Sequence, residues 1–320
     1  MVANLTTRLG QLTSTPAGGP YVGKNRIING NVSVDQRNAG ASQTFTAAAA
    51  VAYCVDRFYA SCTGANITGQ QVAGTAPYQY AYKFTGATSN TATLFGQRIE
   101  SLNIADLVST TVVGQAQIAS STITTVTWTA YYANTTNTFS AKTSIATGTI
   151  TINSTPTIYT FSFNAGSSAA NGVAIEFTTG ALVGSATLQY SGVQLEVGTI
   201  ATPYEFNQYQ AQLAQCQRYY QIIDSGNFGY AGASTQVGGG ITFKTEMRAA
   251  PSISASAAIV VGVTAVGNFT QSSASAVWDS SRVSTRGGQA VLTNLTSIAT
   301  GYVYAIETTV GGQILLNAEL

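Results

Sequence analysis

The feature that most constrains the fold is a succession of short β-type segments that begins at Asn25. About nine runs rich in β-branched and aromatic residues, separated by polar turns, fall before Gly198. Apolar and polar residues alternate most clearly in TTVTWTAYYA and TIYTFSFNA, with the period of a half-buried strand. Strands this close together leave no room for βαβ crossovers. The pattern predicts an all-β fold with a jelly-roll β-sandwich over residues 25–204.

One short helix is expected after Pro203, over residues 205–224. Apolar residues recur there at intervals of three and four, as in the a and d positions of a heptad. The six residues of this stripe are Phe206, Tyr209, Leu213, Cys216, Tyr220 and Ile223. About two and a half heptads are fewer than a coiled coil needs, so the stripe indicates an amphipathic helix that packs on its own domain. A three-fold helical collar, with these residues as the oligomer interface, is the alternative.

The two ends of the chain differ in character. Residues 1–24 are rich in Gly, Pro, Ser and Thr and predict an extended arm that docks on a neighbouring protein. After the helix the β pattern resumes over residues 225–320, as in GGGITFKTEM and GYVYAIETT. This stretch predicts a second, smaller β-sandwich domain.

Composition excludes several classes of partner. Hydrophobic residues make up 45% of the chain and charged residues 8%, so the surface must consist largely of Ser, Thr, Asn, Gln and Gly. The 13 cationic residues are scattered without a basic patch, which argues against nucleic-acid binding. No run approaches the roughly 18 apolar residues of a membrane span, and the first residues lack the pattern of an export signal. We therefore expect no membrane partner.

The sequence contains no histidine, which removes most nucleophilic triads and nearly all common zinc sites. The carboxylates show no local pairing motif, and no glycine-rich phosphate loop precedes a helix. We expect no enzyme activity, no catalytic residues, no cofactor and no metal site. Cys54, Cys62 and Cys216 are expected to be buried thiols, with a bridge between Cys54 and Cys62 left open.

Seven blocks along the chain resemble one family. They are NRIINGNVSVDQRNAG (25–40), VDRFYA (55–60), GQRIESLNIADL (96–107), GVQLEVGTIATPYEF (192–206), LAQCQRYYQ (213–221), MRAAPSI (247–253) and NAEL (317–320). In this order they resemble bacteriophage virion structural proteins with a carbohydrate-binding-module-like jelly roll, of the tail-fibre or minor tail protein type. The chain departs from that family in the compact stretch from Ser109 to Leu188, where longer relatives carry insertions.

The resemblance implies a fibre-like subunit of the virion, assembled in the cytoplasm of the bacterial host. It implies a homotrimer that attaches to other virion proteins through the amino-terminal arm and contacts polysaccharide on the host surface. A capsid decoration (cement) or head-fibre protein with a purely structural role is the alternative. A depolymerase, which would have to act through carboxylates, is a third hypothesis.

Carbohydrate recognition combines an aromatic platform with polar side chains that hydrogen-bond sugar hydroxyls. Trp128 and Tyr132 fall on one face of a predicted strand, followed by Asn134 in the next turn. An aromatic strand face of this kind is also typical of a sandwich core. The second group of candidates for ligand or partner binding surrounds a tryptophan in a Ser-rich stretch that resembles an exposed loop: Trp278, Asp279 and Arg282.

Overall fold

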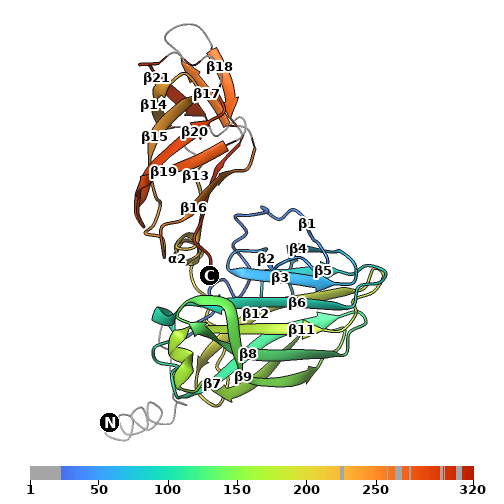
Figure 1. Cartoon of the computed structure of the whole chain (residues 1–320). Helices are drawn as coiled ribbons and strands as arrows, with labels where there is room; N and C mark the ends of the chain where they lie inside the picture. Colours follow the sequence, from blue (N-terminus) through green and yellow to red (C-terminus); the bar gives the residue numbers. More distant parts are fainter. Residues whose placement is uncertain are drawn as a thin grey trace, which may run out of the picture. The chain divides into compact units, whose positions relative to one another are not determined.

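The computed structural model describes residues 23–223, 227–257, 259–263, 269–273, 275–295, 298, 300–307 and 312–320. The chain divides into two compact units, Met1–Tyr209 together with Leu320, and Gln210–Glu319 (Figure 1). We call them unit 1 and unit 2. Apart from Gly23 and Lys24, the arm predicted over residues 1–24 lies outside the described residues.

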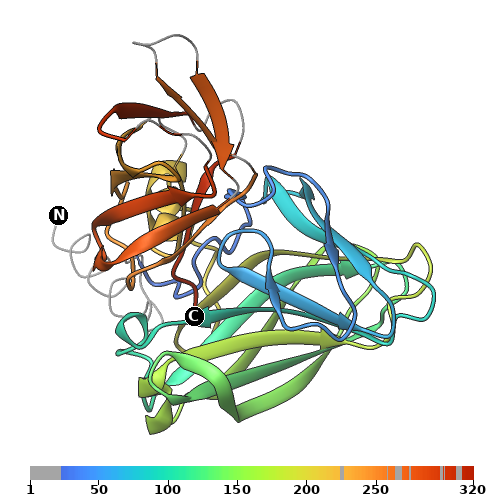
Figure 2. The same ribbon diagram turned by 45° about the horizontal axis from the view of Figure 1, so that its top comes forward.

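Unit 1 is a β-sandwich of two antiparallel six-stranded sheets, whose strands form two layers in Figure 2. The first sheet has the order β1 (Gln43–Phe45), β4 (Ile67–Ala73), β5 (Tyr80–Thr85), β12 (Thr187–Val197), β7 (Thr111–Ser120) and β10 (Thr157–Asn164). The second has the order β2 (Ala52–Tyr53), β3 (Phe58–Thr63), β6 (Ala92–Ile99), β11 (Val173–Thr179), β8 (Thr125–Thr135) and β9 (Thr138–Thr151). Two 3-10 turns, η1 (Ser101–Asn103) and η2 (Ser167–Asn171), lie in connections. The all-β jelly-roll prediction is confirmed.

Aromatic side chains from both sheets fill the core of unit 1. Phe95 on β6 stacks on Tyr190 of β12 at 4.9 Å between ring centroids and on Phe58 of β3 at 4.6 Å. Burial of each such ring contributes roughly 2 to 3 kcal/mol to folding. The alternation of apolar and polar residues in the sequence therefore matches the structure, because every second side chain of a strand points into the core between the two sheets.

Unit 2 contains a seven-stranded and a three-stranded sheet that share a second apolar core. The larger sheet has the order β18 (Phe269–Ser273), β17 (Ile259–Val263), β21 (Val303–Glu307), β14 (Asn227–Ala233), β15 (Gln236–Thr242), β20 (Gly287–Thr293) and β19 (Ser275–Val283). The smaller has the order β13 (Tyr220–Ile223), β22 (Ile314–Asn317) and β16 (Ser252–Ala255). All the strand pairs in both sheets are antiparallel.

The predicted helix is much shorter than its apolar stripe. Helix α2 covers Tyr209–Gln217, and its buried side chains are Gln212 and Cys216. Tyr220 and Ile223 lie in β13, opposite Asn317 and Ile314 of β22. The aromatic and β-branched segment YYQII gains a hydrogen-bonded ladder and a buried face by pairing with the end of the chain. The six stripe residues therefore do not share one helical face.

All three cysteines are buried and unbridged, as predicted for structural thiols. The Sγ of Cys54 donates to the carbonyl of Phe58, and the Sγ of Cys62 donates to the carbonyl of Phe45, both at 3.3 Å. Burial raises the pKa of Cys54 to about 12. This thiol is therefore held in its protonated, unreactive form.

Candidate functional site

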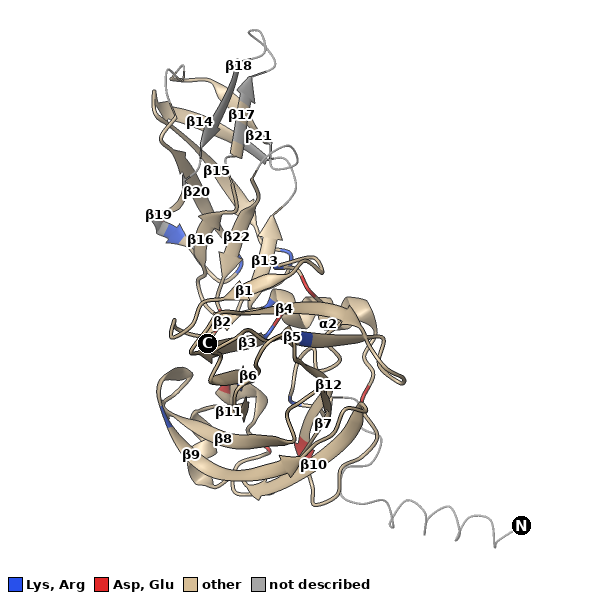
Figure 3. Cartoon of the chain, turned by 90° about the vertical axis from the view of Figure 1, so that its right-hand side faces the viewer, with Lys and Arg blue, Asp and Glu red and all other residues tan. Residues whose placement is uncertain are grey.

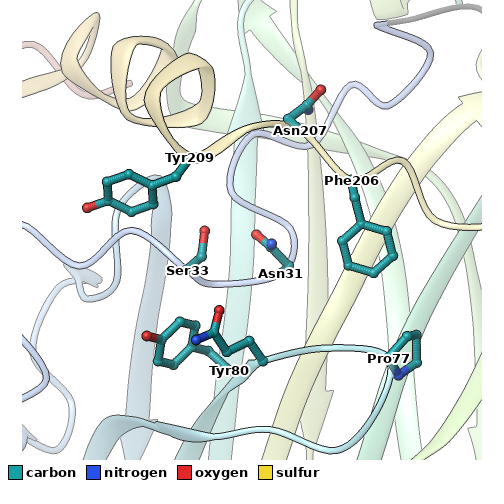
Figure 4. Close-up of a pocket in the computed structure, with 8 residues that line it drawn as sticks. Asn31, Ser33, Pro77, Tyr80, Phe206, Asn207 and Tyr209 are labelled. Carbon is teal, nitrogen blue, oxygen red and sulfur yellow. The ribbon is translucent and has the colours of Figure 1, made fainter.

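One concave site of unit 1 is a pocket of about 620 Å³, within the range of small-molecule sites. Figure 4 shows Asn207, Phe206 and Tyr209 along one side, Tyr80 and Pro77 along the other, and Asn31 and Ser33 between them. Its eight lining residues are Asn31, Ser33, Pro77, Gln79, Tyr80, Phe206, Asn207 and Tyr209. They come from three segments that are far apart in the sequence.

The first wall follows the start of the described chain, which runs along β12. The Oδ1 of Asn25 accepts the backbone N–H groups of Leu195 at 3.0 Å and Ile27 at 2.9 Å. At Gly30 the carbonyl accepts the N–H of Val193 at 2.9 Å, and a Cβ there would lie 1.9 Å from the Val193 carbonyl oxygen. Only glycine permits this close approach. It places Asn31 at the pocket.

A left-handed turn just before that wall redirects the chain. Asn29 has a φ of 60° and is 1% exposed. Its side chain exchanges two hydrogen bonds with the backbone of Val34, at 2.8 and 3.0 Å, and donates to the carbonyl of Asp56 at 3.0 Å. Asparagine tolerates this conformation and satisfies the buried backbone groups around it. The turn at Asn29–Gly30 therefore positions Asn31 and Ser33.

The second wall is the segment after β12, which is fixed by buried polar side chains. Glu196 is 1% exposed, and its Oε1 accepts the N–H of Thr202 at 2.7 Å and an amide N–H of Gln194 at 3.0 Å. The Oε1 of Gln194 in turn accepts the N–H of Glu205 at 2.8 Å. The charged groups of the segment from Gly192 to Phe206 therefore bond inside the unit and hold this wall in place.

Two aromatic rings, those of Tyr78 and Tyr204, support Phe206 at the mouth of the pocket. Tyr78 and Tyr204 meet edge to face at 5.2 Å, and Phe206 lies 5.8 Å from Tyr78 and 4.9 Å from Tyr204. Phe206 nevertheless remains 55% exposed, and Tyr209 54%. Tyr78 packs on Gly192, where a Cβ would lie 2.1 Å from its ring. The rings hold an apolar platform that faces solvent.

The pocket has the chemistry of neutral polar recognition. Asn31, Gln79 and Asn207 bring amide groups, and Ser33 brings a hydroxyl, so donors and acceptors are both present. Tyr80, Phe206 and Tyr209 bring aromatic faces. Charged segments are sparse and isolated along the ribbon in Figure 3, and no charged residue lines this pocket. Among the described residues no group of three or more Cys, Asp or Glu side chains is placed to hold a metal ion.

The first group of sequence candidates is not assembled into a platform. Trp128 lies in β8, is 7% exposed and stacks on Phe161 at 4.7 Å, so its ring belongs to the core. Tyr132 is half-buried farther along the same strand. Asn134 is exposed, and its Oδ1 accepts the hydroxyl of Thr143 at 2.8 Å. The interpretation of Trp128 as a sugar platform is corrected, because the inner face of the sheet is covered by the opposite one.

The second group lies in a strand and not in an exposed loop. Trp278 on β19 is half-buried, donates from Nε1 to the carbonyl of Pro251 at 2.7 Å and packs 6.0 Å from Phe243. Asp279 and Arg282 form an ion pair at 3.6 Å. The guanidinium of Arg282 also donates to Gln289 at 2.7 Å. The indole therefore holds β19 against Pro251 and Phe243 within unit 2. The prediction that Trp278 lies in an exposed loop is corrected.

The predicted oligomer stripe is divided between different environments. Phe206 and Tyr209 line the pocket, while Cys216, Tyr220 and Ile223 are buried and Leu213 is half-buried. Sequence reasoning thus found two pocket residues but gave them another role, and it did not single out the other six. The Pro and aromatic residues of TAPYQY before β5 were the available signal for one wall.

A second surface feature lies on the seven-stranded sheet of unit 2. Direct cross-strand pairing aligns Val303, Tyr230, Gly238, Val291 and Val277 in one row over β21, β14, β15, β20 and β19. Val303 is 60% exposed, Tyr230 56% and Val277 44%. We call this row the apolar stripe of unit 2. Solvent-exposed apolar groups in a row of this kind are typical of a contact surface.

Comparisons with known proteins bear on fold only. No protein-family profile matches the sequence, and no curated protein matches it. Among solved structures, a Bacteroides thetaiotaomicron protein provisionally described as sugar-binding shares 14% identity at a TM-score of 0.36, over 54% of this chain and 99% of its own. The family 11 carbohydrate-binding module of Clostridium thermocellum shares 9% identity at a TM-score of 0.31, over 50% of this chain and 98% of its own. The enzymatically active domain of tailspike protein 4 of bacteriophage CBA120 shares 13% identity at a TM-score of 0.33, over 54% of this chain and 21% of its own.

These neighbours are carbohydrate-binding-module-like β-sandwiches and one tailspike. The match spans about a fifth of the tailspike chain. In the described part of the chain, no helix has the length and apolar character to cross a membrane.

Proposed function

We propose that the protein is a non-enzymatic structural protein of a bacteriophage particle that binds surface glycans of the host through the pocket of unit 1. The observation that carries glycan binding is the meeting of exposed aromatic rings with neutral amide and hydroxyl groups in one pocket. Aromatic rings pack on the apolar face of a sugar, and amides bond to its hydroxyls.

Membership of a virion rests on the sequence blocks that resemble phage structural proteins, from Asn25–Gly40 to Asn317–Leu320. In this proposal a fibre-like subunit attaches to another virion protein through residues 1–24 and is assembled in the cytoplasm of the bacterial host. A capsid decoration or head-fibre role is the second candidate; in it the apolar stripe of unit 2 would contact the capsid in place of a second copy of this chain. Copy number relative to the major capsid protein in intact particles discriminates between the two.

Replacement of Phe206 by Ala is expected to weaken glycan binding by about tenfold, which corresponds to about 1.4 kcal/mol. The ring is 55% exposed and forms the apolar platform of the pocket, so its loss removes stacking with little effect on the core. The measurement is binding of the purified full chain to an array of bacterial surface polysaccharides, followed by calorimetric titration of the best ligand.

The matched control is Ile200→Ala, because Ile200 is 64% exposed in the same segment and does not line the pocket. This variant should bind as the wild type does. Equal affinity of the Phe206→Ala variant and the wild type would place the binding site elsewhere. An absence of binding to every polysaccharide, together with no competition of phage infection, would refute the glycan-binding role.

We further propose that the protein is a homotrimer whose subunits meet through the apolar stripe of unit 2. The stripe carries no charged side chain, so a copy of the same surface can approach it without like-charge repulsion. Closed cyclic symmetry suits a subunit that projects from a particle. Helix α2 is less suited to this role, since only nine residues are helical and its buried side chains are Gln212 and Cys216.

The Tyr230→Glu variant is expected to lower the mass of the assembly from trimer to monomer at micromolar concentration, because it places a charge at the centre of the stripe. Light scattering and sedimentation provide the measurement. Leu213→Asp, which puts a charge on α2, should leave the trimer intact. A monomeric wild type would contradict the trimer. If only the Leu213→Asp variant is monomeric, the interface lies on helix α2 and not on the apolar stripe.

A further inference from the structure

We infer that the pocket of unit 1 selects uncharged sugar residues and rejects uronic and sialic acids. The inference rests on the proposed glycan binding and names the class of glycan. None of the eight lining residues carries a charge, although the walls contain polar groups on every side. A ligand that enters this pocket therefore meets amide, hydroxyl and aromatic groups.

The ionisable groups behind the second wall are already paired. Glu205, next to Phe206, accepts the backbone N–H of Asn25 at 2.9 Å through Oε2 and that of Gly23 through Oε1. Lys24 donates to the carbonyl of Pro203 at 2.9 Å and to the hydroxyl of Thr202, and its Nζ lies 3.8 Å from Glu196. Lys24 is consequently committed to holding this wall.

Arg26, two residues after Lys24, is also committed to a partner. Arg26 pairs with Asp106, donating through Nε at 3.1 Å and through a second guanidinium nitrogen. A sugar carboxylate in the pocket would thus lose water without gaining an ion pair, and such burial is unfavourable.

The polar groups present suit vicinal hydroxyls. The amides of Gln79 and Asn207 each offer one acceptor oxygen and one donor NH₂, which can bond to neighbouring hydroxyls of a pyranose in two directions. A carboxylate accepts hydrogen bonds only, so it would leave the acceptor oxygens of these amides without a donor. Selection against acids therefore follows from both charge and hydrogen-bond complementarity.

The test compares acidic polysaccharides with the same polysaccharides after reduction of their carboxylates. The probes are uronic-acid-containing bacterial capsular polysaccharides and their carboxyl-reduced forms, in which each carboxylate has become a hydroxymethyl group, together with neutral polysaccharides. Binding of the full chain is expected to be at least tenfold tighter to neutral or reduced forms than to the acidic parents. Equal or tighter binding to the acidic parent overturns the selectivity but leaves glycan binding intact. Failure of all probes to bind overturns the proposed function itself.

A charge-introducing variant locates the selectivity in the pocket. Asn207→Lys supplies a cation to the lining and should raise affinity for the acidic parent of the best reduced probe at least tenfold, with the gain lost in high salt. Gln208→Lys is the matched control, because Gln208 is exposed, adjacent in sequence and not part of the lining. An equal gain from both variants would show that the effect is a general surface charge, and would contradict selection by the pocket.

Discussion

Replacement of Gly192 by Ala is expected to destabilise unit 1 by about 2 to 5 kcal/mol and to weaken glycan binding as well. Gly192 has a φ of 58°, which costs other residues about 1 to 2 kcal/mol. Its Cβ would also lie 2.1 Å from the ring of Tyr78, and forced repacking of this kind costs about 1 to 3 kcal/mol. Because Tyr78 supports Phe206, displacement of its ring also disturbs the platform.

Gly184→Ala separates the two causes. Gly184 has nearly the same φ, 59°, but no atom lies within 4 Å of a Cβ there, so this variant shows backbone strain alone. Chemical unfolding is followed by fluorescence in a Trp278→Phe background, where Trp128 is the remaining tryptophan and reports on unit 1. If both glycine variants lose the same stability and bind glycans equally well, the contact between Gly192 and Tyr78 does not support the site.

The stability of unit 1 is expected to fall by about 3 kcal/mol as the pH rises from about 4 to about 7, because of Asp56. Burial raises the pKa of this carboxyl from 3.8 to about 6, against the opposing effect of Arg37. Between these two values the folded state keeps a proton that the unfolded chain has released, so folding becomes less favourable as the pH increases. A difference of about two units between the pKa of Asp56 in the folded and unfolded states corresponds to about 3 kcal/mol of stability.

The absence of histidine makes this dependence unusually visible, since no imidazole titrates in the same interval. Burial also raises the pKa of Asp35, which adds to the slope with the same sign. Asp56→Asn should flatten the pH profile of stability, because an amide does not titrate. The variant should still fold, since the amide can keep both bonds to Gln36 after rotation of the Gln36 side chain. Asp106→Asn removes a half-exposed carboxylate and serves as the charge control. A wild-type slope that survives in the Asp56→Asn variant would assign the effect to another group.

Those elements whose signal is local could be predicted from the sequence. The run TIYTFSFNA became β10 (Thr157–Asn164), and TTVTWTAYYA became most of β8 (Thr125–Thr135). Alternation of side chains and β-branched composition depend only on neighbouring residues, so they are readable in one dimension. The all-β class and the buried thiols followed from the same kind of local evidence.

The remaining features depend on residues that are far apart in the sequence. Whether Trp128 faces a sugar or the core was decided by the opposite sheet, which supplies Phe161. The helix ends at Gln217 because β22, near the other end of the chain, pairs with Tyr220–Ile223.

The pocket shows the same division between local and tertiary information. The sequence by itself determined the residue types that form the pocket, which are turn residues, amides and uncharged aromatic side chains. Only the tertiary structure brought together the walls from residues 31–33, 77–80 and 206–209. The physical reason is that β12 holds the start of the described chain through Leu195 and the second wall, residues 206–209, through Gln194. Such pairings between distant segments leave no periodicity in the sequence from which they could be read.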